Sequence, residues 1–271
     1  MIKEETLNNI IVRPLISINN NDESKVKGGK LFSNPYNTTF ICAKRKSGKT
    51  STLAHILQKT SDKKTVFWIF CPTTKVDTSW ISLIKILEEK GNVVNVFDSI
   101  MDGKINLLNE IINDLSNPEP VETKTDKPAP LIIKIKIEED VKQKKEYKPK
   151  KIAPKHIFVF DDISNELKNV AVSTLLKKSR HFQSAVYVSS QYANDLQPMS
   201  IKQLDYFLCF KSFSRDKLEH IHRLLDLSID LNQFYNIYDF CFENSKGYDF
   251  LYIDVRNQLY RKNFNKAIVM D

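Results

Sequence analysis

The sequence predicts an α/β fold in which a mainly parallel β-sheet is flanked by helices. Short runs of β-branched and aromatic residues alternate with segments whose apolar residues recur at helical spacing. Two of the strand-like runs lead directly into polar groups, Gly48-Lys49-Thr50 after the first and Asp161-Asp162 after a later one. Alternating strands and helices favour parallel pairing through right-handed crossovers.

The individual elements follow from this spacing. Strands are expected over 38–42, 65–71, 93–97, 156–160, 184–191 and 206–210, with two late strands near Phe240 and Phe250. Helices are expected over 51–60, 80–90, 105–115, 165–178, 216–227 and 231–238. The dense aromatic residues near the end of the sequence favour core and edge packing of a β-rich region, although stacking on nucleic-acid bases is an alternative.

The domain organisation is read from composition. The 271 residues are enough for one large α/β domain over 31–271, preceded by an arm over 1–30. The alternation of strands and helices is interrupted at about 117–155. This segment is rich in Pro and Lys and is predicted to be an insertion, with a possible exposed strand over 131–137. No apolar run approaches the length of a membrane span, so a cytosol-like compartment is expected. The four widely spaced cysteines are expected to be buried free thiols: Cys42, Cys71, Cys209 and Cys241.

The net charge of +8 leaves two interpretations open. A basic protein can bind a polyanion such as nucleic acid. The same charge also results from a Lys-rich surface in a compositionally biased genome. Charge alone does not separate these two interpretations.

The first polar group has the residue order of a phosphate-binding loop. Backbone N–H groups at a helix N-terminus form a nest for phosphate oxygens, and Gly48 would let the backbone approach them closely. Lys49 would reach the β- and γ-phosphates, and the Thr50 hydroxyl would bind Mg²⁺. The motif normally opens with glycine, where this sequence has Ala43. The expected nucleotide-binding residues are Ala43, Lys44, Arg45, Lys46, Ser47, Gly48, Lys49, Thr50 and Ser51.

The second polar group supplies carboxylates at the end of a hydrophobic strand. The carboxyl ends of parallel strands line the crevice in which ligands bind. Asp161 is therefore expected to hold Mg²⁺ together with Thr50, and Asp162 to orient the attacking water. The alternative is that both carboxylates only favour the start of the next helix.

Two further residues are candidates for catalysis. Gln191 ends a strand, where an amide can sense the γ-phosphate or position water. Arg180 lies at the end of a predicted helix, where a basic residue suits the helix dipole. Its alternative role is an arginine finger that reaches the nucleotide of a neighbouring subunit.

Taken together, these motifs resemble the poxvirus-type genome-packaging ATPases of the FtsK–HerA superfamily. The resemblance rests on the phosphate loop, Phe67 to Thr73, Phe158 to Ile163, and Ser179-Arg180-His181 before a strand that ends in Gln191. It covers roughly 32–227 apart from the insertion. It implies a RecA/FtsK-like P-loop ATPase that uses ATP and Mg²⁺ to move double-stranded DNA into a preformed capsid.

The same resemblance implies partners and a location. It implies a homo-oligomeric ring, a pentamer or a hexamer, in the cytoplasm of a host cell or associated with the virion. A capsid vertex or portal protein is a further implied partner. By resemblance, Lys49 and Thr50 bind ATP and Mg²⁺, while Asp161, Asp162, Gln191 and Arg180 take the roles given above.

Two other functions compete with this one. A P-loop kinase of a small molecule would need a lid that carries arginines, and the few arginines of this chain do not cluster as such a lid. A virion assembly factor that binds ATP with little turnover would tolerate the loss of Asp162, whereas a motor would not.

Overall fold

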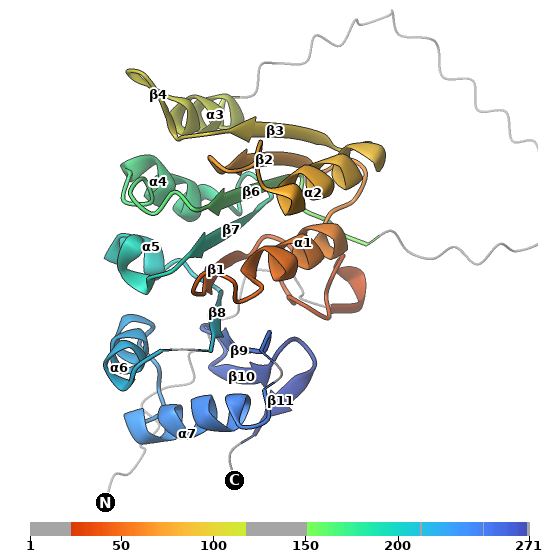
Figure 1. Cartoon of the computed structure of the whole chain (residues 1–271). Helices are drawn as coiled ribbons and strands as arrows, with labels where there is room; N and C mark the ends of the chain where they lie inside the picture. Colours follow the sequence, from red (N-terminus) through yellow and green to blue (C-terminus); the bar gives the residue numbers. More distant parts are fainter. Residues whose placement is uncertain (1–22, 118–150, 212, 246, 270–271) are drawn as a thin grey trace, which may run out of the picture.

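The computed structural model describes residues 23–117, 151–211, 213–245 and 247–269, which form one nine-stranded sheet with helices on both faces. The strand order is β11-β10-β9-β8-β1-β7-β6-β2-β3, and it can be followed from the bottom to the top of Figure 1. The strands are β1 (Thr38–Cys42), β2 (Val66–Phe70), β3 (Val93–Phe97), β6 (His156–Asp161), β7 (Ser184–Ser190), β8 (Tyr206–Phe210), β9 (Phe250–Asp254), β10 (Leu259–Lys262) and β11 (Lys266–Ile268). A separate pair is formed by β4 (Met101–Asp102) and β5 (Ile105–Asn106).

The helices divide between the two faces of the sheet. Helices α1 (Lys49–Thr60) and α2 (Thr78–Glu89) pack on one face, at the right of Figure 1. The opposite face is covered by α3 (Leu107–Ser116), α4 (Val170–Lys178), α5 (Pro198–Ile201), α6 (Arg215–Leu224) and α7 (Leu231–Phe242). Short 3₁₀ turns lie at Glu23–Lys25 and Ala193–Asp195.

The central strands form because apolar residues cover both of their faces. Every residue of β1, β7 and β8 is buried, as expected for parallel strands that lie between two helix layers. Phe40 of β1 faces α3–α7, whereas Ile41 faces α1 and α2. The strands from β8 to β3 in this order are parallel, so their carboxyl ends share one edge of the sheet. The predicted mainly parallel sheet flanked by helices is therefore confirmed.

The C-terminal part departs from the prediction. A strand near Phe240 was expected, but Phe240 belongs to α7, so that prediction is wrong. Asp230 starts this helix with a capping box, and the buried residues after it recur at helical spacing: Phe234, Ile237, Tyr238, Cys241 and Phe242. Strand β9 begins at the expected Phe250 and pairs antiparallel with β8, and β10 and β11 extend the sheet.

Two helices begin later than their apolar patterns indicate. Helix α3 begins at Leu107 because the Asn106 side chain accepts a hydrogen bond from the Asn109 backbone. Helix α4 begins at Val170 because Asn169 caps it in the same way. Polar capping at the first turn thus fixes where each helix starts.

The remaining predictions concern the sequence outside the central sheet. The possible strand over 131–137 and most of the arm over 1–30 lie outside the described residues. Where the arm is described, Val26 is buried and forms a parallel bridge with Ile152. All four cysteines are buried and free, as predicted. Among the helices of the described residues, none combines the length and the apolar character that a membrane span requires.

Candidate functional site: a phosphate loop facing two carboxylates

The phosphate loop connects the end of β1 to the first residue of α1. Gly48 is the N-cap of α1 and has φ 91°, a left-handed conformation that favours glycine. Lys46 also adopts a positive φ of 63°, and the Ser47 hydroxyl closes the turn by donating to the Lys44 carbonyl at 2.6 Å. The backbone N–H groups at the start of α1 are thereby available to an anion.

Ala43 fits the place where the motif normally has glycine. Its φ is not positive, and its side chain is completely buried among the residues that face α1 and α2. The Ala43 N–H donates to the Ser190 carbonyl at 3.0 Å, which ties the loop to the end of β7. Alanine therefore causes no backbone strain here.

The other loop residues differ in exposure. Lys49 is buried, Thr50 is half-buried at the second position of α1, and Ser51 is exposed. Lys44, Arg45 and Lys46 are exposed. Three cations therefore lie on the outside of the loop, while Lys49 points into the protein.

Lys49 lies between the two carboxylates that end β6. Its Nζ is 3.1 Å from Oδ1 of Asp161 and 2.5 Å from Oδ1 of Asp162. In the sheet β7 separates β1 from β6, so this contact spans two strand spacings at the carboxyl edge. The structure thus joins the two polar groups that the sequence predicts to meet.

These contacts set the charge state of Lys49. Burial acts to lower the pKa of its ammonium, but the attraction of Asp161 and the hydrogen bond with Asp162 outweigh burial. The pKa of Lys49 therefore lies above its usual value, and the side chain is a permanent cation at neutral pH. A buried cation at this position can attract phosphate oxygens.

Asp161 and Asp162 are held in different ways. Asp161 is 1% exposed, and its Oδ2 accepts a hydrogen bond of 3.1 Å from Nε1 of Trp80. The Asp162 side chain is 42% exposed, and its backbone has a left-handed φ of 56°. Asp161 is thus a fixed carboxylate within the protein, while the Asp162 side chain is exposed at the surface of the site.

The oxygen donors at the site suit a hard divalent cation. Mg²⁺ is usually held by one or two carboxylates, substrate phosphates and water. The Asp161 carboxylate and the Thr50 hydroxyl supply such oxygens, and the described residues hold no cluster of three or more His, Cys, Asp or Glu that would indicate another metal. The residues present therefore fit Mg²⁺ that arrives with a nucleotide.

Gln191 lies at the same edge of the sheet. It directly follows β7, and its side chain lines a cavity of about 430 Å³ together with Arg45, Asp98, Asp162 and Glu166. The predicted water-positioning amide and the predicted water-orienting carboxylate therefore share one cavity beside the phosphate loop.

Arg180 lies at the opposite edge of the sheet. It follows the end of α4, and its Nη2 is 2.8 Å from Oδ1 of Asp205, the residue that precedes β8. The other Asp205 oxygen accepts from the backbone N–H of Thr38, the first residue of β1, at 3.0 Å. The phosphate loop begins at the far end of that strand, so Arg180 does not reach the phosphate loop of its own chain.

Sequence reasoning missed two aromatic residues at the site. Trp80 was expected only as part of a helix, and nothing in its pattern signals the hydrogen bond to Asp161. Tyr248 lies against the phosphate loop: a Cβ added to Gly48 would stand 2.8 Å from Cδ1 of its ring. Asp98 could have been found, because it follows β3 at the same carboxyl edge.

Known proteins resemble this chain in their structure rather than in their sequence. No protein-family model and no curated protein matches the sequence. Among solved structures, the genome-packaging NTPase B204 of Sulfolobus turreted icosahedral virus 2 in complex with AMP is similar, with a TM-score of 0.53, 17% identity, and coverage of 87% of this chain and 100% of that chain. B204 of Sulfolobus turreted icosahedral virus, a DNA-packaging ATPase, has a TM-score of 0.52, 16% identity, and coverage of 85% and 98%.

The identity to these structures is low, so the likeness concerns the fold. It extends over almost the entire length of each B204 chain. The chain therefore shares the mostly parallel α/β fold of the viral genome-packaging NTPases.

Proposed function

We propose that this protein is an ATPase that drives double-stranded viral DNA into a preformed capsid. The observation that carries the proposal is the position of the Lys49 ammonium. It lies within 3.1 Å of the carboxylates of Asp161 and Asp162, at the edge of the sheet that carries the phosphate loop. The fold shared with B204 supports the packaging role, since that protein is described as a genome-packaging NTPase.

Nucleotide binding would begin at the phosphate loop. The first backbone N–H groups of α1 and its helix dipole attract the phosphates. Lys49 already carries its charge in a buried position, so it would exchange part of its contact with the carboxylates for contact with phosphate oxygens. B204 in complex with AMP supports nucleotide binding by this fold.

The metal would be held by Asp161 and Thr50. Mg²⁺ neutralises charge on the transferred phosphoryl group. Asp161 suits this role because Trp80 and Lys49 fix its two oxygens, so the carboxylate is preorganised. Asp162 is more exposed and would orient the attacking water, assisted by Gln191 from the same cavity.

Arg180 would act on a neighbouring copy. It lies at the edge of the sheet opposite its own phosphate loop, and its side chain is about half exposed. A head-to-tail ring brings different surfaces of adjacent copies together, so an arginine far from its own site can complete the next one. We therefore propose a homo-oligomeric ring, a pentamer or a hexamer, that binds double-stranded DNA and docks on a capsid vertex or portal protein in the host cytoplasm.

The experiment that tests the proposal measures ATP hydrolysis with and without double-stranded DNA, together with native mass. We expect DNA to stimulate hydrolysis by an oligomer. Lys49→Ala should weaken ATP binding by about tenfold or more, because it removes a buried cation. Lys85→Ala is the matched control, since Lys85 is an exposed lysine of α2 that pairs with Glu89 at 4.0 Å. Unchanged ATP affinity in Lys49→Ala would refute the site, and hydrolysis indifferent to DNA would refute the motor.

A further inference from the structure

A basic cavity of about 320 Å³ lies at the edge of the sheet opposite the phosphate loop, where β1 and β8 begin. Of the described residues that line it, one is a carboxylate, Asp205, and four are cations: Lys177, Arg180, Lys202 and Arg256. Cations that outnumber carboxylates in a confined space favour the entry of an anion. The roles proposed above use Arg180 alone and leave the other three cations unexplained.

The four cations reach the cavity from separate elements. Lys177 belongs to the last turn of α4, Arg180 follows that helix, and Lys202 is the C-cap of α5. A basic residue at the end of a helix suits the helix dipole, which accounts for these three positions. Arg256 instead follows a strand, β9, so no helix terminus accounts for its position.

Asp205 is fixed in place between β1 and β9. Its backbone N–H donates to the Thr38 carbonyl at 2.9 Å, and its carbonyl accepts from the Val255 N–H at 2.9 Å. Its side chain is 7% exposed, and Oδ2 accepts from the Thr38 N–H at 3.0 Å. The second oxygen, Oδ1, therefore has a defined position at the cavity.

Both arginines contact this one oxygen. Nη2 of Arg180 is 2.8 Å from Oδ1 of Asp205, and Nη2 of Arg256 is 3.3 Å from the same atom. Because they share an acceptor, the two guanidinium groups lie side by side. A guanidinium has five N–H donors, so each group keeps most of its donors after this contact. Two such forks match the oxygens of a phosphate.

The turn that carries Arg256 is also held in place. Strand β9 ends at Asp254, which pairs in register with Tyr206, the first residue of β8. The Asp254 carboxylate accepts two hydrogen bonds of 2.9 Å from Asn257, one from its backbone and one from its side chain. The backbone of Arg256 is thus positioned before any ligand arrives, which lowers the entropy cost of binding.

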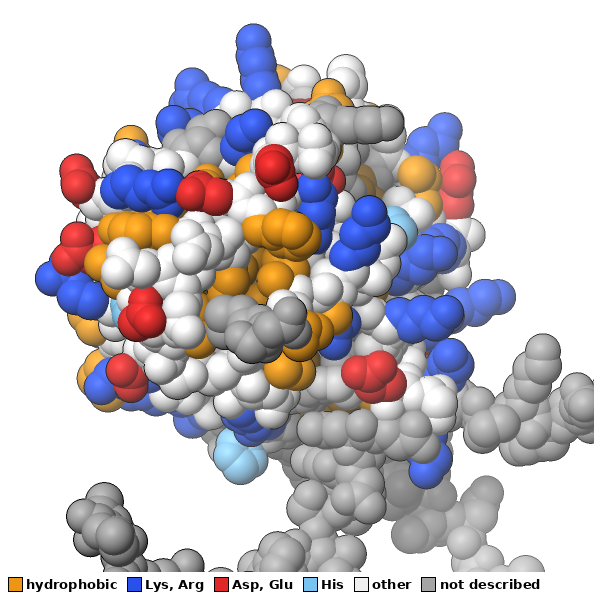
Figure 2. Space-filling view, turned by 90° about the horizontal axis from the view of Figure 1, so that it is seen from below, with side chains coloured by type: hydrophobic (Ala, Val, Ile, Leu, Met, Phe, Trp, Pro, Cys, Tyr) orange, Lys and Arg blue, Asp and Glu red, His pale blue; other side chains and the backbone are white. Residues whose placement is uncertain are grey.

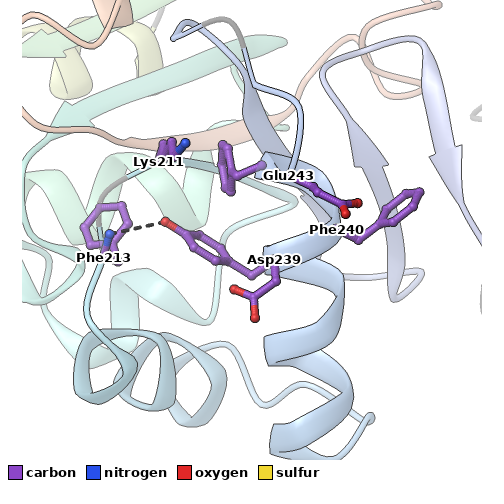
Figure 3. Close-up of a pocket in the computed structure, with 7 residues that line it drawn as sticks. Lys211, Phe213, Asp239, Phe240 and Glu243 are labelled. Atoms are coloured by element: carbon purple, nitrogen blue, oxygen red, sulfur yellow. Dashed lines mark hydrogen bonds between the residues drawn. The ribbon is translucent and has the colours of Figure 1, made fainter.

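A larger cavity elsewhere has the opposite balance of charge. It lies between β8 and α7 and has a volume of about 680 Å³, and Figure 3 shows Lys211 together with the carboxylates of Asp239 and Glu243. Figure 2 shows the end of the molecule that carries α7, where acidic and basic side chains surround a hydrophobic centre. In the described part of the chain, that cavity therefore does not suit a phosphate, whereas the one around Asp205 does.

We propose that Arg180 and Arg256, held together by Asp205, form a second phosphate-binding site, separate from the phosphate loop. Lys177 and Lys202 add to its positive charge. The phosphate comes either from a nucleotide bound by a neighbouring copy or from free phosphate in solution, since both present the same tetrahedral oxyanion. Only the first of these sources rests on the function proposed above.

The first experiment tests the site itself. Inorganic phosphate is titrated into full-length Lys49→Ala, whose phosphate loop has lost its buried cation, and NMR signals of the arginine Nε–H groups are followed. The Arg180 signal should shift until it saturates. Adding Arg256→Ala should lower the affinity read from this signal about tenfold, because charged donors are lost. Adding Arg223→Ala instead is the matched control and should leave the affinity unchanged, since Arg223 is an exposed arginine of α6.

The second experiment identifies the source of the phosphate. If a neighbouring copy supplies it, Arg256→Ala with an intact phosphate loop should bind ATP normally but hydrolyse it about 10²-fold more slowly. Mixing with Lys49→Ala should then restore part of the rate, because those copies still carry Arg256. Hydrolysis at the normal rate, together with the lower affinity for inorganic phosphate, would assign the site to free phosphate.

The outcomes separate this site from the proposed function. The absence of a saturable Arg180 shift in Lys49→Ala would overturn the second phosphate site, and so would a shift with the same affinity after Arg256→Ala. An equal loss of affinity in the Arg223→Ala control would overturn it too, because it would show that only the total charge matters. The proposed function fails on different results, namely unchanged ATP affinity in Lys49→Ala or hydrolysis indifferent to DNA.

Discussion

The indole Nε1–H of Trp80 donates a hydrogen bond of 3.1 Å to Oδ2 of Asp161, and both side chains are buried. Trp80 belongs to α2, so this bond connects a helix on one face of the sheet to the carboxylate that ends β6. It leaves Oδ1 of Asp161 directed at Lys49. The orientation of the proposed metal ligand therefore depends on a residue outside both sequence motifs.

The first prediction tests this dependence with Trp80→Phe. Removing the indole donor leaves a buried carboxylate oxygen without its partner, so the free energy of unfolding should fall by about 1–3 kcal/mol. The Mg²⁺ concentration for half-maximal ATP hydrolysis should rise as well. Urea unfolding and a Mg²⁺ titration of the ATPase rate measure these effects. Trp68→Phe is the control for the Mg²⁺ effect, because Trp68 also donates a side-chain hydrogen bond, but to His156 at 3.3 Å.

The second prediction concerns Asp162→Asn. Asparagine tolerates the left-handed φ of 56° at this position, so the backbone should remain unchanged. ATP should still bind, while hydrolysis should fall about 10²–10⁴-fold because the group that orients water has lost its charge. Single-turnover hydrolysis and equilibrium ATP binding separate the two effects. Turnover close to that of the unchanged protein would favour the assembly factor over the motor.

The third prediction concerns Arg180→Ala. Asp205 keeps a second cation in this variant, since Nη2 of Arg256 is 3.3 Å from the same Oδ1, so the fold should remain intact. ATP binding should be normal, and hydrolysis should fall about 10³–10⁵-fold if the guanidinium serves a neighbouring copy. Mixing with Lys49→Ala should restore some hydrolysis, because each variant supplies what the other lacks.

The control for this experiment is Arg223→Ala, which removes an exposed arginine from the last turn of α6. It should hydrolyse ATP at the normal rate. Full activity of Arg180→Ala, or of a monomeric form of the protein, would contradict the role in a neighbouring copy.

The fourth prediction concerns pH. Burial, with a smaller contribution from Lys155, lowers the pKa of His156, and its Nδ1 accepts a hydrogen bond from Trp68. The unfolded chain therefore binds this proton more readily, so the stability from His156 is present above about pH 6.5 and is lost as the pH falls through the lowered pKa. The slope should not exceed about 1.4 kcal/mol per pH unit.

Urea unfolding between pH 5 and pH 7.5 measures this slope. His156→Gln should reduce it, whereas His55→Gln, at an exposed position of α1, should leave it unchanged. An identical slope in both variants would assign the pH dependence to other groups.

The sequence determined the parts of this protein that depend on local patterns. The alternation of apolar runs and helical spacing is visible in the residues themselves, and it predicted the parallel sheet. Gly48-Lys49-Thr50 lies just beyond the end of β1, and Asp161-Asp162 lies at the end of β6. Because the carboxyl ends of parallel strands share one edge of the sheet, the sequence predicted that these two groups lie close together. Phe240 shows where local patterns fail, because an aromatic residue on the exposed face of α7 reads equally well as part of a strand.

Only the tertiary structure decided which distant side chains touch. Trp80 on Asp161, Tyr248 over Gly48, and Arg180 beside Asp205 each join residues far apart in the sequence, and no spacing rule encodes such contacts. They follow from how the helices pack on the sheet and how the strands are ordered. The residues of the phosphate loop could thus be identified from the sequence. Which side chains orient and surround that loop depends on how the helices pack on the sheet.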